Sequence, residues 1–220
     1  MLPRILEAEV MDTPADAADY DAMDFAAVNA AFADDCLKAV GSVTTILDVG
    51  TGTARIPIEL AKRSSSLQII GVDLSDEMLI LGRQNVAAAG LTDQITLFLV
   101  DAKGMPFEDG TFDAVVSNSI VHHIPDPSHC FQEIIRLAKP GGTIFLRDLF
   151  RPADKVTLEQ LVETYAGNDT PHQKKLFADS LHAALTVDEV RSIVASFGFD
   201  PATVTATSDR HWTWSAKKAS

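Results

Sequence analysis

Short apolar runs alternate with amphipathic stretches along residues 44–150, the middle of the chain. The apolar runs predict five strands, at 44–49, 67–72, 95–100, 112–118 and 142–148. Four of them are apolar almost throughout, which is typical of a parallel sheet covered on both faces. The stretches between them predict helices at about 54–64, 75–89 and 128–138. This alternation predicts an α/β fold with a doubly wound, mostly parallel sheet.

The pattern changes after residue 150, where three further helices and two strands are expected. The helices are predicted at 154–166, 171–184 and 187–198. Thr186 is followed three residues later by Glu189, a pair typical of a capped helix start. The strands are predicted at about 199–207 and 211–217. A parallel sheet that ends in an antiparallel hairpin is a specific topology.

The net charge of −13, from 18 basic and 31 acidic residues, is unevenly distributed. Residues 1–36 contain nine acidic residues against one basic residue, Arg4. A protein that binds nucleic acids or anionic membranes needs a basic face, so we expect neither partner. The chain has no apolar run of the roughly 20 residues that span a membrane, and its start lacks the order of a signal peptide. Cys36 and Cys130 have no metal-ligand spacing, and we expect a cytoplasmic protein.

The sequence DVGTGTA, at residues 48–54, follows the first predicted strand and precedes the first helix of the sheet. Glycines at such a turn let the backbone bend tightly and approach a ligand, and the helix N-terminus presents free N–H groups. The dinucleotide fingerprint G-x-G-x-x-G would need glycine at position 55, which is Arg55. Asp48 is also foreign to that fingerprint, because a carboxylate would repel a pyrophosphate but could anchor an ammonium group.

This turn resembles the first motif of class I S-adenosylmethionine-dependent methyltransferases, an acidic residue followed by G-x-G-x-G, with Ala54 replacing the third glycine. Other family elements follow in order: Asp73 after the second strand, Asp101-Ala102 after the third, and RLAKPGG at 136–142. The resemblance implies that Asp73 holds the ribose hydroxyls and that Asp101-Ala102 meets the adenine. The cofactor-binding residues that it implies are Tyr20, Asp48, Gly50, Thr51, Gly52, Asp73, Leu74, Met78, Asp101, Ala102, Asn118 and Ser119.

Single members of this set also have simpler explanations. Asp73 could cap the following helix, and Met78 could belong to the core. Tyr20 opens the first helix of the chain, which is predicted in the acidic N-terminal segment. It could be part of a lid over the cofactor or an ordinary packing residue. An acidic residue after the second strand also binds ribose in NAD-dependent oxidoreductases. Asp48, Arg55 and the closing hairpin favour the methyltransferase over that alternative.

His122 and His123 follow the fourth predicted strand and are our candidate catalytic residues. Such a pair resembles a feature of the family's small-molecule branch, which includes quinone and sterol methyltransferases. A histidine there could take a proton from a hydroxyl or thiol acceptor, since its usual pKa is near 6.5. Either ring could instead pack the loop. Arg147, Asp148 and Arg151 could orient a substrate carboxylate or pair with one another.

No metal site is expected from the sequence. The fourth strand ends in Ser117-Asn118 instead of an acidic residue, unlike the metal-dependent catechol-type methyltransferases. Trp212 and Trp214 share one face of the last predicted strand, where they could line an acceptor pocket or belong to the core.

We therefore predict one methyltransferase domain, 1–220, with a seven-stranded sheet. Its segments are an acidic helical lid at 1–42, a cofactor-binding core at 43–150, a helical insert or substrate cover at 151–186, and a last helix with the closing hairpin at 187–220. The predicted function is in-line methyl transfer from S-adenosylmethionine to a small-molecule acceptor. The alternatives are a catalytically silent S-adenosylmethionine-binding partner or sensor and an NAD-dependent oxidoreductase. The sequence indicates no oligomeric state.

Overall fold

The structure is a computed structural model that describes residues 2–7, 12–23 and 25–219. The chain divides into two compact units, each assembled from separate stretches of sequence. The Gly-turn unit consists of Val10–Asn118, Pro127–Leu146 and Ser215–Ser220. The His-pair unit consists of Met1–Glu9, Ser119–Asp126 and Arg147–Trp214. These units do not follow the four predicted segments, and the single-domain assignment stays a prediction.

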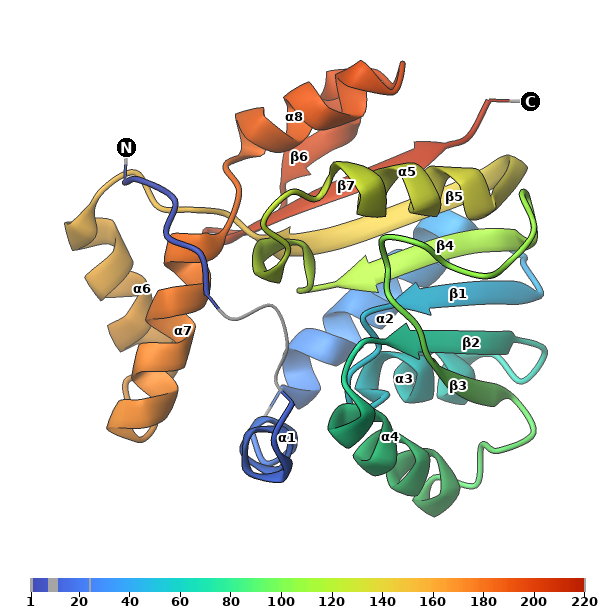
Figure 1. Ribbon diagram of the computed structural model, residues 1–220, viewed down its shortest axis with the longest axis horizontal. Coiled ribbons are helices and arrows are strands. Elements are labelled where there is room, and N and C mark those ends of the chain that lie inside the picture. Colours follow the sequence, from blue (N-terminus) through green and yellow to red (C-terminus); the bar gives the residue numbers. More distant parts are fainter. Residues whose placement is uncertain (1, 8–11, 24, 220) are drawn as a thin grey trace. The chain divides into compact units, whose positions relative to one another are not determined.

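The strands form one seven-stranded sheet in the order β3-β2-β1-β4-β5-β7-β6 (Figure 1). Their bounds are β1 Thr45–Val49, β2 Gln68–Asp73, β3 Ile95–Leu99, β4 Phe112–Asn118, β5 Ala138–Leu149, β6 Val204–Ala206 and β7 His211–Lys217. β1 pairs in parallel with β2 and β4, and β2 pairs in parallel with β3. β6 and β7 pair antiparallel. The predicted doubly wound sheet with a closing antiparallel hairpin is confirmed.

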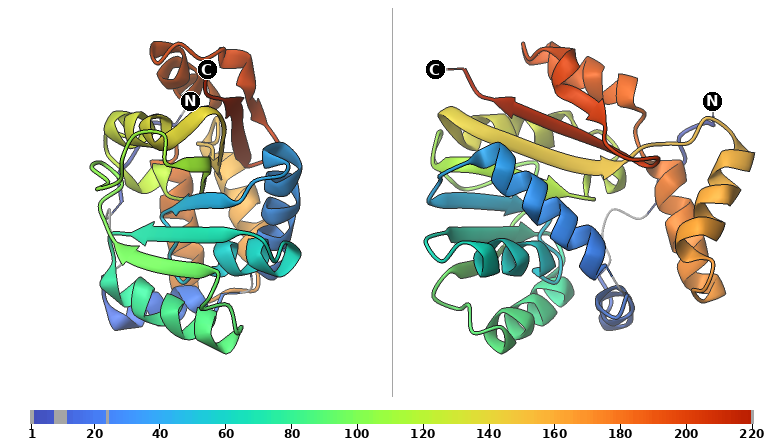
Figure 2. Two further views of the ribbon diagram at one scale, coloured as in Figure 1. Left: turned by 90° about the vertical axis from the view of Figure 1, so that its right-hand side faces the viewer. Right: turned by 180° about the vertical axis from the view of Figure 1, so that it is seen from behind.

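Helices cover both faces of the strands in the Gly-turn unit. They are α1 Pro14–Asp21, α2 Ala26–Val40, α3 Arg55–Arg63, α4 Asp76–Ala88 and α5 Ser128–Leu137. Figures 1 and 2 show α2 on one face of these strands and α5 on the other. Phe32 of α2, Leu60 of α3 and Leu79 of α4 share one buried cluster with strand residues such as Ile46. Burial on both faces explains why these strands are apolar almost throughout.

The His-pair unit contains α6 Lys155–Ala166, α7 Pro171–Ala183, α8 Val187–Ser196 and the short 3₁₀ turns η1 Val121–His123 and η2 Pro201–Thr203. α6 and α7 pack side by side (Figure 1). Their apolar core is formed by Leu149, Leu158, Leu161, Leu181 and Ala184. The predicted cap of α8 is confirmed, because the Thr186 hydroxyl accepts from the Glu189 N–H and the Glu189 carboxylate accepts from the Thr186 N–H.

The structure corrects two predictions about strands β5 and β6 and decides between the two explanations of Trp212 and Trp214. β5 begins at Ala138 and not at 142, and the N–H of Gly141 within the added part donates to Lys218 O at 2.9 Å. β6 covers only Val204–Ala206, since Pro201 starts a 3₁₀ turn where the strand was expected. Trp212 and Trp214 are both 0% exposed, which favours their assignment to the core over a pocket lining.

The start of the chain also differs from the expected pattern. Tyr20 lies in the last turn of α1, and α2 begins only at Ala26, so the prediction that Tyr20 opens the first helix is wrong. The N–H of Met23 donates to Tyr20 O at 3.2 Å, a tightened turn of the kind that closes helices. None of the helices in the described residues has the length and apolar character needed to cross a membrane.

Candidate functional site

The turn between β1 and α3 contains three residues with a positive φ angle. Gly50 and Gly52 have φ of 74° and 53°, values that a residue with a side chain rarely adopts. Ala54 adopts 62° at the N-cap of α3, where it is fully buried. The N–H groups of Gly50 and Thr51 donate to Val72 O at 2.8 and 2.9 Å. The turn is therefore fixed to the end of β2.

Asp73 reinforces this attachment with its carboxylate. Oδ2 accepts from the N–H of Gly52 at 2.7 Å, and Oδ1 accepts from the N–H of Ser75 at 2.9 Å. Burial raises the pKa of Asp73, against the lowering effect of these hydrogen bonds. Ser75, not Asp73, caps α4, since its hydroxyl accepts from the N–H of Met78 at 3.2 Å. The alternative of Asp73 as the helix cap is wrong.

Asp48 is a buried carboxylate with an unsatisfied oxygen. Its side chain is 1% exposed, and Oδ2 accepts no hydrogen bond from any described residue. Burial raises the pKa of Asp48 to about 7, the Thr51 hydroxyl opposes this rise, and the nearby Asp73 carboxylate adds to it. A buried acceptor that lacks a partner is costly. A cation bound near this turn would offset that cost.

A pocket of about 360 Å³ lies against the glycine turn, a size typical of small-molecule sites. Five of the predicted cofactor residues line it: Tyr20, Gly50, Thr51, Gly52 and Asn118. The other lining residues were not predicted and come mainly from α1–α3 and the loop between α1 and α2: Asp21, Met23, Phe25, Ala26, Asn29, Thr53, Arg55, Ile56, Ile58, Glu59 and Lys62.

The end of α1 borders this pocket through packing and an ion pair. A Cβ added to Gly52 would lie 3.9 Å from Cε1 of Tyr20, so the tyrosine ring stands close to the turn. The Asp21 carboxylate pairs with Arg55 at 2.8 Å and accepts from Nδ2 of Asn85 at 3.0 Å. These contacts connect residues distant in sequence, which is why no local pattern pointed to Asn85 or to the partners of Asp21.

The remaining cofactor candidates of this unit do not line the pocket. Leu74 is 41% exposed, whereas Met78 is 6% exposed and belongs to the buried face of α4. Oδ1 of Asp101 accepts from the N–H of Lys103 at 2.8 Å and pairs with its Nζ at 3.2 Å. Ala102 is half-buried beside it. Their predicted contacts with adenine stay predictions.

In the His-pair unit, His122 is held by a buried carboxylate. Its Nδ1 lies 2.5 Å from Oδ1 of Asp148, and its main-chain N–H donates to Oδ2 at 3.1 Å. Burial lowers the pKa of His122, but Asp148 and Glu7 together raise it above the usual value. For Asp148, burial raises the pKa and the His122 ring lowers it, with a net decrease. The two side chains therefore form a charge-assisted pair.

The two arginines near Asp148 have their own partners. Nε of Arg147 donates to the Thr213 hydroxyl at 2.9 Å. Arg151 donates to Ala184 O at 2.9 Å and pairs with Glu189 at 2.8 Å. Ser119, a predicted cofactor residue, has φ of 60° and donates its N–H to Arg147 O at 2.9 Å. Ser119 belongs to the His-pair unit and is not among the pocket residues.

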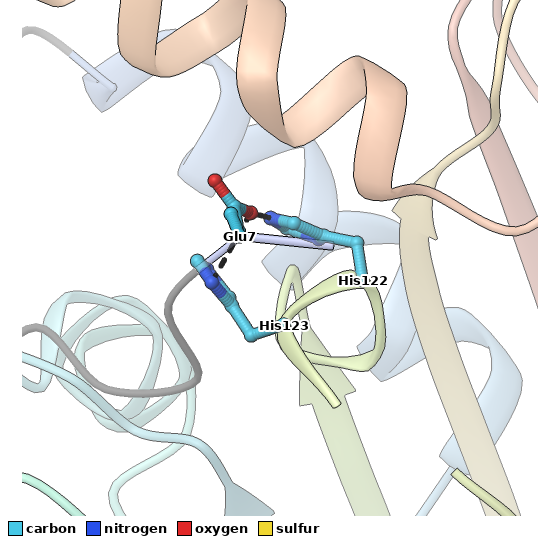
Figure 3. A group of neighbouring side chains, drawn as sticks. All are labelled: Glu7, His122 and His123. Atoms are coloured by element: carbon cyan, nitrogen blue, oxygen red, sulfur yellow. Dashed lines mark ion pairs between the residues drawn. The ribbon is translucent and has the colours of Figure 1, made fainter. Parts of the chain in front are cut away.

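Glu7 completes a cluster that the sequence did not predict (Figure 3). Its Oε1 lies 3.5 Å from Nε2 of His122 and 3.2 Å from Nδ1 of His123. Burial raises the pKa of Glu7, and the His122 ring opposes that rise. Glu7 and the histidines are far apart in the chain, and no motif connects them.

Comparison with known proteins shows what this chain is similar to. Residues 47–146 match the family model of a methyltransferase domain. The chain is 30% identical over 164 residues to the ubiquinone/menaquinone biosynthesis C-methyltransferase of Geobacter sulfurreducens, an alignment that covers 70% of this chain and 64% of the relative. The predicted resemblance to S-adenosylmethionine-dependent methyltransferases is thereby confirmed. The chain spans less than two thirds of that relative's length.

Solved structures share the fold. A methyltransferase structure from Methanococcus maripaludis superimposes with a TM-score of 0.77 at 22% identity, and the match covers 98% of both chains. Phosphoethanolamine N-methyltransferase 2 of Haemonchus contortus, solved with S-adenosyl-L-methionine, superimposes with a TM-score of 0.65 at 23% identity. That match covers 85% of this chain and 42% of the other. At these identities the likeness concerns the fold alone.

Proposed function

Because residues 47–146 match the family model of a methyltransferase domain, we propose that the chain transfers the methyl group of S-adenosylmethionine to a small-molecule acceptor by in-line displacement. When bound, S-adenosylmethionine supplies an electrophilic methyl group on a positively charged sulfur. The observation that carries this proposal is the glycine turn, which lines a pocket of ligand size and is backed by the buried carboxylate of Asp48 and the half-buried carboxylate of Asp73.

The residues around the turn suit a cationic cofactor. The backbone of Gly50–Gly52 and the ring of Tyr20 line the pocket, where they can exclude water from the reacting atoms. The buried charge of Asp48 favours an ammonium or sulfonium group nearby, because opposite charges stabilise each other at low dielectric. We assign the ribose hydroxyls to Asp73. The adenine environment is assigned to Leu74, Met78, Asp101 and Ala102, and Asn118 and Ser119 complete the proposed set.

Displacement at a methyl group depends on alignment more than on acid–base chemistry. A base is needed only if the acceptor atom carries a proton at the working pH. His122 and His123 are the proposed catalytic residues for such an acceptor. Both nitrogens of His122 already face carboxylates, Asp148 and Glu7, whereas the side chain of His123 is 20% exposed. The more accessible ring is the better candidate for contact with an acceptor.

The relative's printed name directs the choice of acceptor. It is a C-methyltransferase of ubiquinone and menaquinone biosynthesis, so hydroquinones head the set of acceptors to be tested for this chain. A phenolic hydroxyl ionises more readily than an alcohol and activates the neighbouring ring carbon. This matches a site whose candidate bases are imidazoles.

We further propose that the acidic N-terminal region attracts the cationic cofactor. Glu9 and Asp24 of this region lie outside the described residues. Asp21 of this region lines the pocket, where its carboxylate is paired with Arg55. The attraction should weaken with added salt, because counter-ions screen exposed charges. A cofactor affinity that does not change with ionic strength would contradict this role.

The test of the proposed function has two stages. Calorimetry compares S-adenosylmethionine, S-adenosylhomocysteine and NAD, and we expect binding of the first two; preference for NAD would refute the proposal. Acceptors are then incubated with S-adenosylmethionine, and formation of S-adenosylhomocysteine is measured against enzyme-free controls. If the cofactor binds but no acceptor of a panel with hydroxyl, amine, thiol and ring-carbon sites yields product, methyl transfer is contradicted and silent binding is favoured.

A further inference from the structure

Three side chains of the His-pair unit bring nitrogen and oxygen donors together at one point (Figure 3). Glu7 comes from the N-terminal segment, and His122 and His123 come from the 3₁₀ turn η1. Oε1 of Glu7 lies 3.5 Å from Nε2 of His122 and 3.2 Å from Nδ1 of His123. One ligand atom from each residue lies within 4.8 Å of the others.

These separations fit ligands that share one metal ion. Zinc binds imidazole nitrogen at about 2.0–2.1 Å and carboxylate oxygen at about 2.0–2.2 Å, so tetrahedral ligands lie about 3.3–3.5 Å from each other. The distances from Glu7 to both rings match that spacing. The buried Oε1 atom of Glu7 accepts no hydrogen bond within the described residues, although two ring nitrogens are near. Its lone pairs are therefore available to a cation.

A second layer of polar contacts orients two of the three ligands. The Asp148 carboxylate holds Nδ1 of His122 at 2.5 Å, which leaves Nε2 directed at Glu7. A carboxylate on the far nitrogen is the usual support of a metal-binding histidine, since it fixes the tautomer and raises the basicity of the ligating nitrogen. The Ser180 hydroxyl donates to Oε2 of Glu7 at 3.3 Å, which leaves Oε1 for the ion.

The N-terminal segment is anchored so that Glu7 stays near the histidines. Arg4 donates to the main-chain oxygens of Ala183 at 2.6 Å, Pro125 at 2.8 Å and Ile124 at 2.9 Å. The N–H of Ile5 donates to His182 O at 3.1 Å. These bonds tie the segment to the η1 loop and to the end of α7. The oxygen ligand is thus positioned by the fold before any ion arrives.

Charge and accessibility are also compatible with a bound cation. Two carboxylates, Glu7 and Asp148, flank two rings that are neutral when they act as ligands. A divalent ion would offset these two negative charges, and the Arg4 guanidinium near His122 already offsets part of them. The side chains of His122, Glu7 and His123 are 4%, 13% and 20% exposed, so the cluster is shielded but open on the side of His123.

We propose that Glu7, His122 and His123 bind one divalent transition-metal ion, with zinc the best match to two imidazoles and one carboxylate. This ligand set leaves a coordination position open, as catalytic zinc sites do. A hydroxyl or carbonyl oxygen of a small molecule could occupy that position, where the ion lowers the pKa of a hydroxyl. The two histidines would then act as ligands instead of proton acceptors. Metal binding does not depend on the proposed cofactor or on methyl transfer.

Zinc binding to the full chain tests this proposal. Protein stripped with a chelator is titrated with zinc in competition with a chromophoric chelator, and we expect one tightly held ion per chain. Glu7→Gln keeps the size of the side chain but removes its charge, and it should weaken zinc binding at least about 10-fold. His122→Ala and His123→Ala should weaken it further. Asp148→Asn should weaken zinc binding by about 10–100-fold, because it alters the carboxylate that orients His122.

His172→Ala is the matched control, since His172 is exposed on α7 of the same unit and lies outside the cluster. Cobalt(II) provides a second readout, because a four-coordinate site gives an intense visible absorption that Glu7→Gln should abolish. Circular dichroism identifies variants that fail to fold, and Glu7→Gln is the mildest change. Equal zinc affinity in wild type and folded Glu7→Gln, or loss of the ion in His172→Ala, would overturn the proposal. Calorimetry with S-adenosylhomocysteine separates this outcome from failure of the proposed function.

Discussion

Replacement of Asp48 by asparagine should stabilise the ligand-free protein, and more so at high pH. The reason is that a fully buried carboxylate with an unsatisfied oxygen is costly to keep ionised. Its pKa of about 7 in the folded chain lies well above the value near 3.9 of an unfolded aspartate. The folded state then binds the proton more tightly than the unfolded state, so stability falls as the pH rises from about 4 to about 7.

The size of the effect follows from the two pKa values. Each pH unit between them corresponds to about 1.36 kcal/mol, so ionised Asp48 costs about 4 kcal/mol near pH 8. Near pH 5.5, where most of the folded molecules hold the proton, the cost is about 2 kcal/mol. An asparagine pays neither cost. We therefore expect the gain from Asp48→Asn to be about 2 kcal/mol larger near pH 8 than near pH 5.5.

Urea unfolding followed by far-UV circular dichroism measures this difference at both pH values. Asp93→Asn is the matched control, because Asp93 is exposed and carries the same change of charge. Its effect should differ little between the two conditions. Addition of S-adenosylmethionine at about 100 times its dissociation constant should stabilise the wild type by about 2.7 kcal/mol. The variant should gain less, because it lacks the charge that favours a cation.

A gain that is equal at both pH values would refute the proposed cost of ionisation at Asp48. A destabilised variant at high pH would show that the carboxylate has a partner that the structure does not reveal. If Asp48→Asn stabilises the protein as expected but S-adenosylmethionine stabilises the wild type and the variant equally, Asp48 is a costly buried charge without a role in cofactor binding.

Three further changes test other parts of the site and the core. Asp73→Ala should weaken S-adenosylhomocysteine binding by about 1.5–3 kcal/mol in calorimetry, and unchanged affinity in a folded variant would exclude the ribose contact. Asp113 accepts two backbone N–H groups and pairs with Lys139 at 2.6 Å, contacts that hold its pKa well below the usual range. Asp113→Asn should therefore lower the unfolding free energy by about 1–3 kcal/mol at neutral pH. That loss should shrink as the pH falls below about 4, because the Asp113 carboxylate protonates in the unfolded chain there while it stays ionised in the folded chain; a loss independent of pH would argue against the charge. Trp214 is fully buried, so Trp214→Ala should cost about 3–5 kcal/mol in urea unfolding, and a small loss would place it outside the core.

The order of strands and helices was predictable because it rests on local patterns. The apolar runs marked β1 to β4 to within one residue at each end, and the Thr186–Glu189 cap was visible three residues apart. The glycine turn at 48–54 was also visible, since glycine spacing between a buried strand and a helix has few other uses. Each of these signals depends on neighbours in the chain, which fix backbone conformation directly.

Strand ends and helix starts were less predictable where distant residues decide them. β5 begins four residues earlier than expected, and its added part contains Gly141, which is hydrogen-bonded to the distant Lys218. The break between α1 and α2 was missed although its cause is local, a hydrogen bond from the N–H of Met23 to Tyr20 O. Backbone hydrogen bonds with remote segments extend or end an element, and no local composition reveals them.

The sequence alone determined the fold class, the cofactor turn and the candidate acids, because these follow from periodicity and from short motifs. Tertiary structure alone decided which charges meet. It placed Asp148 and Glu7 on opposite nitrogens of His122, and it buried Asp48 with an unsatisfied oxygen. The physical reason is that burial and pairing are set by packing between segments far apart in the chain. Those two conditions control the pKa of a carboxylate and the capacity of an imidazole to bind a proton or a metal ion.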